Sequence, residues 1–214
     1  MQRTGHATNC RERAIFTRQI LVACSPRLIF ARELNTRRHF SKISRSTESE
    51  HTGVVIVLMG VSGAGKTTVG SLLAQELHWD FADADDFHSV ANIEKMSAGI
   101  PLTDADRAPW LDTLRAVVAR WIAEKKNAVL ACSALKRSYR NLLHVDERVH
   151  FVYLKGDRDL FSQRLLDRHH HYMKQQMLDS QLLTLEPPLD AIVVDANARP
   201  ESIVSEIRKQ LDLT

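Results

Sequence analysis

From residue 53 onward, short apolar runs alternate with longer amphipathic stretches. Val54–Met59 is continuously apolar and mostly β-branched, which is typical of a strand that is buried on both faces of a parallel sheet. Similar runs at 127–132, 150–154 and 191–194 predict three further strands, and a shorter strand is expected at 79–82. The pattern therefore predicts a sheet of short, mainly buried strands.

Amphipathic helices are predicted between these strands. Trp110 to Ile122 carries apolar residues at helical spacing, and Pro109 before it suits a first helical turn. Segments 136–143, 158–168 and 200–211 are expected to be helical as well. The first predicted strand is also followed by such a stripe, formed by Val69, Leu72, Leu73 and Leu77. Alternation of strand and helix predicts an α/β fold with a doubly wound parallel sheet.

The first 52 residues lack a regular period and differ in charge from the rest of the chain. Residues 1–47 contain nine Arg, one Lys and two acids, a net charge of +8, whereas the remaining 19 bases and 24 acids give −5. We expect residues 1–52 to be a basic N-terminal extension without fixed structure, and residues 53–214 to form the functional domain. The overall charge of +3 is therefore no sign of a domain that binds nucleic acid.

Three interpretations of the extension remain open. An Arg-rich, acid-poor composition is typical of a mitochondrial transit peptide, so residues 1–40 would direct the protein to the mitochondrial matrix. If the start codon is mis-assigned instead, the extension would have no function and the protein would be cytoplasmic. The third interpretation, a basic arm for nucleic acid, is disfavoured by the acidic domain. No apolar run approaches the ~18 residues that span a membrane, so we expect neither a membrane nor a nucleic-acid partner.

One motif points to specific chemistry. Residues 60–67 read Gly-Val-Ser-Gly-Ala-Gly-Lys-Thr and fit the phosphate loop (P-loop) pattern between a predicted strand and a predicted helix. Backbone N–H groups and the helix N-terminus bind phosphate, Lys66 can reach the β- and γ-phosphates, and the Thr67 hydroxyl can hold Mg²⁺. We therefore expect ATP and Mg²⁺ to bind at Gly60, Val61, Ser62, Gly63, Ala64, Gly65, Lys66, Thr67 and Thr68.

An acidic cluster, Asp83-Ala-Asp85-Asp86, begins 17 residues after Lys66, directly behind the predicted second strand. The carboxyl ends of parallel strands meet at one edge of a sheet, so the cluster should lie beside the P-loop. A kinase needs two carboxylates there, one for the metal ion and one to accept the proton of the acceptor hydroxyl. A merely solvated acidic turn is the alternative.

Further segments resemble the gluconokinase family, in particular its thermoresistant type. The resemblance runs from about residue 53 to the C-terminus, covers none of the extension, and is carried by the segments 83–88, 92–96, 99–111, 132–140, 153–156, 171–181 and 185–187. It implies a P-loop fold similar to nucleoside monophosphate kinases, with a mobile lid, in a homodimer. It also implies the ATP-dependent phosphorylation of D-gluconate at the 6-hydroxyl to 6-phospho-D-gluconate.

The resemblance also implies roles for individual residues. Asp85 would be the base near the sugar hydroxyl, and Asp83 would act with Thr67 on the metal side. Arg164 and Arg168 would be lid arginines that close on the transferred phosphoryl group, and the turn Asp195–Asn197 would lie near the adenine. The catalytic residues would be Lys66, Asp85, Arg164 and Arg168, and the substrate-binding residues Asp85, His88, Arg107, Lys136, Arg140 and His171. Cations in this set suit an anionic substrate, because Arg can bind a carboxylate through two hydrogen bonds.

Ala84, Ser89 and His170 depart from the usual family residues, and His170 would reshape the lid. Two other functions remain open. One is a kinase of another small hydroxy-acid, such as shikimate, on the same fold; the segments 104–110 and 132–140 favour gluconate. The other is a nucleotide-dependent switch protein, which would usually carry an Asp where the strand at 127–132 ends in Cys132 and Ser133.

Overall fold

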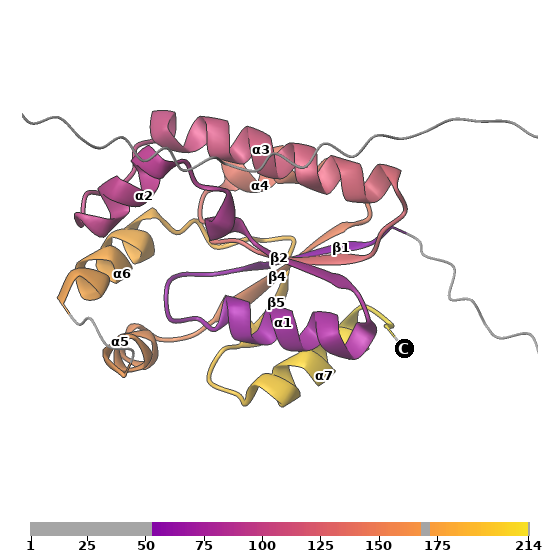
Figure 1. Cartoon of the computed structure of the whole chain (residues 1–214). Coiled ribbons are helices and arrows are strands. Elements are labelled where there is room, and N and C mark those ends of the chain that lie inside the picture. The colour runs from indigo at the N-terminus through magenta and orange to yellow at the C-terminus, as the bar shows by residue number, and fades with distance from the viewer. Residues whose placement is uncertain (1–52, 168–171, 214) are drawn as a thin grey trace, which may run out of the picture. The chain divides into compact units, whose positions relative to one another are not determined.

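The structure is a computed structural model that describes residues 53–167 and 172–213. The predicted extension at 1–52 and the lid residues 168–171 lie outside these ranges. Within the described residues, a sheet of five parallel strands has the order β2-β3-β1-β4-β5 (Figure 1). The strands are β1 (Val55–Met59), β2 (Asp80–Asp83), β3 (Ala128–Ala131), β4 (Val149–Lys155) and β5 (Ile192–Asp195).

Strand β1 lies in the middle of the sheet. It pairs in parallel with β3 on one side and with β4 on the other. All its residues are fully buried, because helices cover both faces of the sheet. The continuous apolar run that predicted this strand is therefore explained by its central position.

Two layers of helices enclose the sheet, which confirms the predicted doubly wound architecture. Helices α1 (Lys66–Leu77) and α7 (Pro200–Gln210) cover one face, and α3 (Asp104–Ala123) and α4 (Arg137–Leu143) cover the other (Figure 1). None of the described helices has both the length and the apolar character that crossing a membrane requires.

The segments beyond the carboxyl ends of the strands were only partly predicted. Helices α2 (Val90–Ser97), α5 (Arg158–Leu166) and α6 (Tyr172–Thr184) lie at that end of the sheet, and the 3₁₀ turn η1 (Ala84–Phe87) follows β2 (Figure 1). The sequence pattern did not predict α2 or α6. An ion pair of 2.7 Å between Arg158 and Asp179 joins α5 to α6.

Helix α3 begins earlier than predicted. Pro109 lies in its second turn, because the helix starts at Asp104 with Thr103 as the N-cap. The Thr103 hydroxyl accepts a hydrogen bond from the Asp106 N–H (3.2 Å), and the Asp106 carboxylate accepts one from the Thr103 N–H (2.9 Å). This capping box fixes the start of the helix, and it precedes the apolar stripe from which the helix was predicted.

Candidate active site

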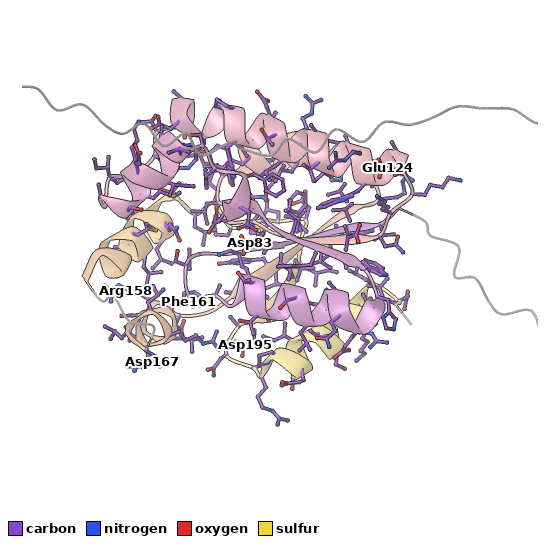
Figure 2. All side chains as sticks on the ribbon, viewed as in Figure 1. Asp83, Glu124, Arg158, Phe161, Asp167 and Asp195 are labelled. Carbon is purple, nitrogen blue, oxygen red and sulfur yellow. The ribbon has the colours of Figure 1, made fainter. Side chains whose placement is uncertain are left out.

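The P-loop connects β1 to α1 and turns tightly against α5. Gly63 and Gly65 have φ angles of +84° and +95°, which side chains rarely adopt. A Cβ atom on Gly63 would lie 2.8 Å from the carbonyl oxygen of Phe161 in α5; Phe161 is labelled in Figure 2. Both the positive φ angle and the close approach of α5 therefore require glycine at residue 63.

The start of α1 brings a lysine, a hydroxyl and a carboxylate together. Lys66 Nζ donates a hydrogen bond to the Val61 carbonyl (3.1 Å). Thr67 Oγ1 donates one to Asp83 Oδ2 (2.7 Å), and Asp83 Oδ1 accepts one from the Asp85 N–H (3.1 Å). The hydroxyl and carboxylate oxygens of Thr67 and Asp83 are ligands that suit Mg²⁺, which takes one or two protein oxygens and keeps several waters.

Two cavities meet at the P-loop. The first, the P-loop cavity, has a volume of about 270 Å³ and is lined by the loop, Asp83 and Leu165 among others. The second, which we call the acceptor cavity, has a volume of about 320 Å³ and extends between η1, α2, α3 and α6. Ser62, Lys66, Asp85 and Met177 line both cavities. A group bound in one cavity would therefore approach a group bound in the other at Lys66 and Asp85.

The Asp85 carboxyl lies at this junction, surrounded by protein atoms but open to the cavities. Burial raises its pKa above the usual value of 3.8, and the nearby negative charge of Asp83 adds to this effect. The positive charge of Lys66 opposes the shift in pKa. A carboxylate with a raised pKa is a stronger base than an exposed one, which is the property that a general base requires.

A histidine and an arginine form one wall of the acceptor cavity. The His88 ring stacks on Trp110 with ring centroids 4.5 Å apart, and Trp110 is itself held by a hydrogen bond from Nε1 to the Ala84 carbonyl (2.7 Å). Burial lowers the pKa of His88; the negative charge of Asp85 opposes this shift, and the positive charge of Arg107 adds to it. The ring is therefore neutral near pH 7, and its buried Nδ1 has no hydrogen-bond partner among the described residues.

Much of the remaining lining of the acceptor cavity is apolar. It comes from α2, from the segment that joins α2 to α3, and from α6, with the side chains of Met96, Ile100, Pro101, Leu102 and Met177. Arg107 Nη1 donates a hydrogen bond to the carbonyl of Leu102 in this lining. A mixture of apolar and polar lining groups is typical of sites that bind small molecules.

Sequence reasoning missed several residues that line the acceptor cavity. Ser133 follows β3, and Ser180 and Gln181 belong to α6. The Gln181 side-chain oxygen accepts a hydrogen bond of 2.6 Å from the Ser62 N–H, and so connects α6 to the P-loop across 119 residues of sequence. Hydrophobic periodicity contains no signal for such a contact; only the family-like segment 171–181 pointed to this region.

Some predicted site residues do not reach the acceptor cavity. Lys136 Nζ forms an ion pair with Asp104 at 2.7 Å, and Arg140 is buried and lines a different cavity. Neither cation lines the acceptor cavity, so their predicted contact with the substrate stays a prediction. Arg168 and His171 lie outside the described residues.

Arg164 lies next to the P-loop. Its Nη2 donates a hydrogen bond of 2.7 Å to the carbonyl of Ala196, and its Nη1 would lie 3.8 Å from a Cβ atom on Gly65. The turn that contains Ala196 borders another cavity, of about 350 Å³, together with Gly156 and Asp157. The position of the adenine near Asp195–Asn197 stays a prediction; Asp195 is labelled in Figure 2.

The fold and this pair of cavities define the class of protein: a P-loop kinase that phosphorylates a small molecule. The family model of shikimate kinase matches residues 62–212, and kinases of this class use ATP as the phosphoryl donor. A probable gluconokinase of Xenopus tropicalis is 46% identical over 178 residues, which cover 74% of this chain and 94% of that protein. Within the shikimate kinase family, the chain belongs to the gluconokinases.

Other relatives support the same conclusion. The thermoresistant gluconokinase of Escherichia coli (strain K12) is 43% identical over 162 residues, which cover 73% of this chain and 93% of that protein. The crystal structure of a gluconokinase from Sinorhizobium meliloti superposes with a TM-score of 0.64 at 36% identity, and covers 75% of this chain and 97% of that chain. The resemblance stated from the sequence is confirmed.

Proposed function

We propose that this protein transfers the γ-phosphoryl group of ATP to the 6-hydroxyl of D-gluconate, which gives ADP and 6-phospho-D-gluconate. The observation that carries the proposal is the junction of the two cavities, which share Lys66 and Asp85. A phosphate held by the P-loop and a hydroxyl in the acceptor cavity would meet there. Such alignment is the main task of an enzyme that transfers a phosphoryl group.

Lys66 and Asp85 have complementary roles at this junction. Lys66 neutralises negative charge on the β- and γ-phosphates as the bond to the leaving oxygen breaks. Asp85 accepts the proton of the attacking 6-hydroxyl, and its raised pKa favours that transfer. The new bond joins the gluconate oxygen to phosphorus, and the leaving oxygen stays on ADP.

Thr67 and Asp83 are the residues that would hold Mg²⁺. Their oxygen atoms lie 2.7 Å apart, and a bound Mg²⁺ would supply positive charge beside the phosphates. In the present structure the Thr67 hydroxyl donates a hydrogen bond to the Asp83 carboxylate, so the two oxygen ligands already lie side by side.

The gluconate carboxylate and hydroxyls are assigned to the wall of the acceptor cavity formed by Arg107 and His88. Arg107 supplies the positive charge that an anionic substrate needs. The neutral His88 ring, with an unpartnered buried Nδ1, can accept a hydrogen bond from a hydroxyl. The amide group of Gln181, which also lines the cavity, can donate one.

Arg164 and Arg168 remain our proposed cations on the transferred phosphoryl group, and His171 a proposed substrate contact. Arg164 is already beside the P-loop, but it would have to exchange its bond to the Ala196 carbonyl for a phosphate oxygen. Closure of the segment around Arg168 would exclude water, which otherwise competes for the phosphoryl group.

Two further proposals concern the whole protein. We propose a homodimer, on the strength of the resemblance to gluconokinases. We propose a cytoplasmic location, or the mitochondrial matrix if residues 1–40 act as a transit peptide. Light scattering on the purified protein and sequencing of the native N-terminus test these two points.

A coupled assay on the full-length protein tests the activity. ADP formation and 6-phosphogluconate formation are measured with D-gluconate, with shikimate and without acceptor, because the family model leaves shikimate as the second candidate. We expect turnover that depends on gluconate and is lost in Lys66→Ala. Lys126→Ala, at the far end of α3 from the P-loop, serves as the matched control and should keep full activity.

Each other outcome has a distinct meaning. Higher turnover with shikimate than with gluconate would replace gluconate as the substrate. ADP formation that does not depend on any acceptor would contradict the kinase assignment. Full turnover by Lys66→Ala would contradict the role of the P-loop.

A further inference from the structure

Arg140 is a charged residue in the interior of the protein, only 6% exposed. It lies on α4 and its Nη1 donates hydrogen bonds of 3.0 Å to the carbonyl oxygens of both Ala134 and Leu135. A buried guanidinium is costly unless its donors are satisfied. Here the two bonds fasten α4 to the segment that leaves β3.

That segment joins the acceptor cavity to the start of the P-loop. Ser133 lines the acceptor cavity, and its carbonyl accepts a hydrogen bond of 3.3 Å from the N–H of Gly60, the first residue of the P-loop. The next residue, Ala134, has a left-handed backbone with φ +41°, which is strained for a residue with a side chain. Such a conformation persists only when surrounding contacts hold it.

Two further contacts, both to its carbonyl groups, hold the strained segment in place. One is the pair of hydrogen bonds from Arg140. The other is the N–H of Glu186, which donates a hydrogen bond of 2.9 Å to the Leu135 carbonyl. Arg140 thus acts on backbone carbonyls next to Ser133, without lining the acceptor cavity itself.

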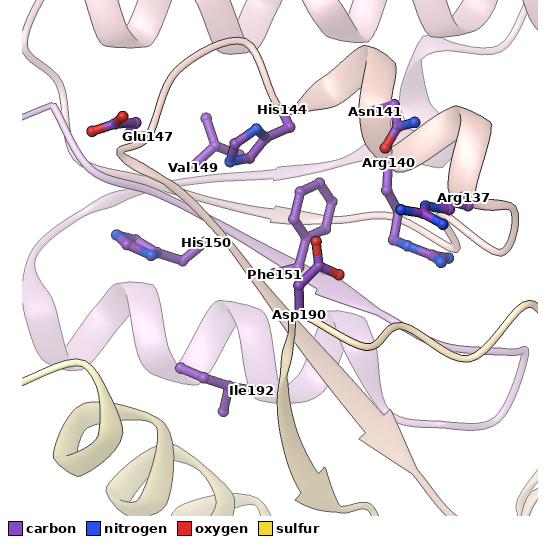
Figure 3. Close-up of a pocket in the computed structure, with 10 residues that line it drawn as sticks. All are labelled: Arg137, Arg140, Asn141, His144, Glu147, Val149, His150, Phe151, Asp190 and Ile192. Carbon is purple, nitrogen blue, oxygen red and sulfur yellow. The ribbon is translucent and has the colours of Figure 1, made fainter.

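The Arg140 head group lies at the edge of a separate cavity of about 370 Å³. Figure 3 shows this cavity, with Arg137, Asn141 and Arg140 on α4 and Asp190 just before β5. Burial lowers the pKa of Arg140, while the negative charges of Asp190 and Glu186 act in the opposite direction. The cavity is large enough to admit a small cation; Asp190 and Glu186 favour its binding at this position, and the charge of Arg137, which lines the same cavity, opposes it.

We propose that Arg140 is a positioning residue of the kinase reaction. It holds the segment 132–136 in its strained conformation, and so keeps Ser133 in place in the acceptor cavity and bonded to Gly60 at the start of the P-loop. This inference rests on the proposed function, and it replaces the expectation that Arg140 contacts the substrate directly.

Steady-state kinetics of three full-length variants test the proposal. Arg140→Ala removes both hydrogen bonds, and Arg140→Lys keeps the charge but not the planar head group that reaches two carbonyls. We expect kcat to fall about 10- to 100-fold in Arg140→Ala, as for displaced groups away from the chemistry, with a smaller fall in Arg140→Lys. Arg137→Met, on the same helix and cavity, should keep kcat and is the matched control.

Chemical rescue and hydrogen exchange can distinguish a role of Arg140 in positioning the segment 132–136 from a general role in the stability of the protein. Methylguanidinium at concentrations that do not denature the wild-type protein should enter the open cavity and restore part of the kcat of Arg140→Ala; methylammonium should not. Without substrate, the backbone amides of residues 132–137 should exchange faster in Arg140→Ala than in the wild type. Methylguanidinium should slow this exchange again.

The possible results are distinguishable. If kcat of Arg140→Ala stays near that of the wild type, or if only KM for gluconate rises while exchange is unchanged, the proposal is overturned. If Arg140→Ala does not fold, Arg140→Lys decides: reduced kcat in a folded protein supports the proposal, and wild-type kcat overturns it. A wild type without gluconate turnover would contradict the proposed function, whereas the exchange measurement would still test the positioning of the segment.

Discussion

The Asp85 carboxyl has the position and the electrostatics of a general base. It lies where the two cavities meet, and burial and the charge of Asp83 both raise its pKa. A carboxyl whose pKa is raised on folding binds its proton more tightly in the folded state. Its contribution to stability is therefore present at low pH and is lost as the pH rises through the raised pKa. At neutral pH the charged Asp85 thus costs stability, which is the cost expected of the base that we propose.

Replacing Asp85 by Asn should remove the base without harming the fold. We expect kcat to fall by about 10²- to 10⁴-fold, the usual contribution of general base catalysis. The wild-type kcat/KM should fall as the pH is lowered through a pKa above 3.8, and Asp85→Asn should lack this acid limb. Urea unfolding at neutral pH should show equal or greater stability of the variant.

The neighbouring acid supplies the control. Asp86 is exposed and lines neither of the two cavities, so Asp86→Asn should keep kcat and the acid limb of the wild type. Asp85→Asn with wild-type kcat, or with an unchanged acid limb, would show that Asp85 is not the base.

Helix α5 and the P-loop depend on each other at one close approach. The backbone of α5 at Phe161 lies where the side chain of any residue other than Gly would begin at residue 63. The same helix carries Arg164, whose hydrogen bond to the Ala196 carbonyl connects α5 to the turn after β5. Packing of α5 therefore holds the P-loop and the turn after β5 in place relative to the helix itself.

Comparison of Gly63→Ala with Gly65→Ala isolates this packing. Both residues have a positive φ, so both variants carry similar backbone strain, but a Cβ on Gly65 meets nothing nearer than Arg164 Nη1 at 3.8 Å. We expect Gly63→Ala to lose about 1–3 kcal/mol more of the free energy of unfolding, as overpacked sites do. If urea titrations show that both variants lose the same free energy of unfolding, then α5 moves away from a Cβ at residue 63 without destabilising the protein.

The two cavities and all the contacts described around them come from residues 60–196. The basic extension has a net charge of +8 over residues 1–47, opposite in sign to that of the remainder. Charge of this kind affects solubility, targeting and non-specific binding more than the chemistry of a buried site.

A chain that starts at residue 48 should therefore keep the kcat and both KM values of the full-length protein. The physical reason is that termini outside the packed domain are usually tolerant of removal. The comparison uses the gluconate assay, with circular dichroism to confirm folding. A truncated protein that is folded but inactive would place part of the extension in the active site.

Hydrophobic periodicity predicted the central elements well and the peripheral ones poorly. Val54–Met59 revealed β1 because burial on both faces leaves no polar position. Helix α2 was missed, although the shorter α4 was predicted, because its apolar residues Val90 and Ile93 are largely exposed and form no buried stripe. The start of α3 was predicted too late, because a polar capping box precedes its apolar residues.

In the site, too, the sequence indicated some residues and missed others. The P-loop and the acidic cluster are local motifs, so the sequence indicated them and the structure brings Thr67 and Asp83 together. Gln181 was not identified as a partner of the P-loop, because its contact with Ser62 joins distant segments. Arg140 was expected at the substrate from the family resemblance and its charge, whereas in the fold it donates hydrogen bonds to backbone carbonyls.

The sequence by itself determined the order of the parallel α/β elements, the P-loop, the acidic cluster and the family, since each depends on residues that are near one another along the chain. Only the tertiary structure decided which side chains share a cavity. Burial, which raises the pKa of Asp85 and lowers that of His88, depends on segments far apart in sequence. The same holds for the direction in which Arg140 points, because a cation binds to whichever acceptors the fold places around it.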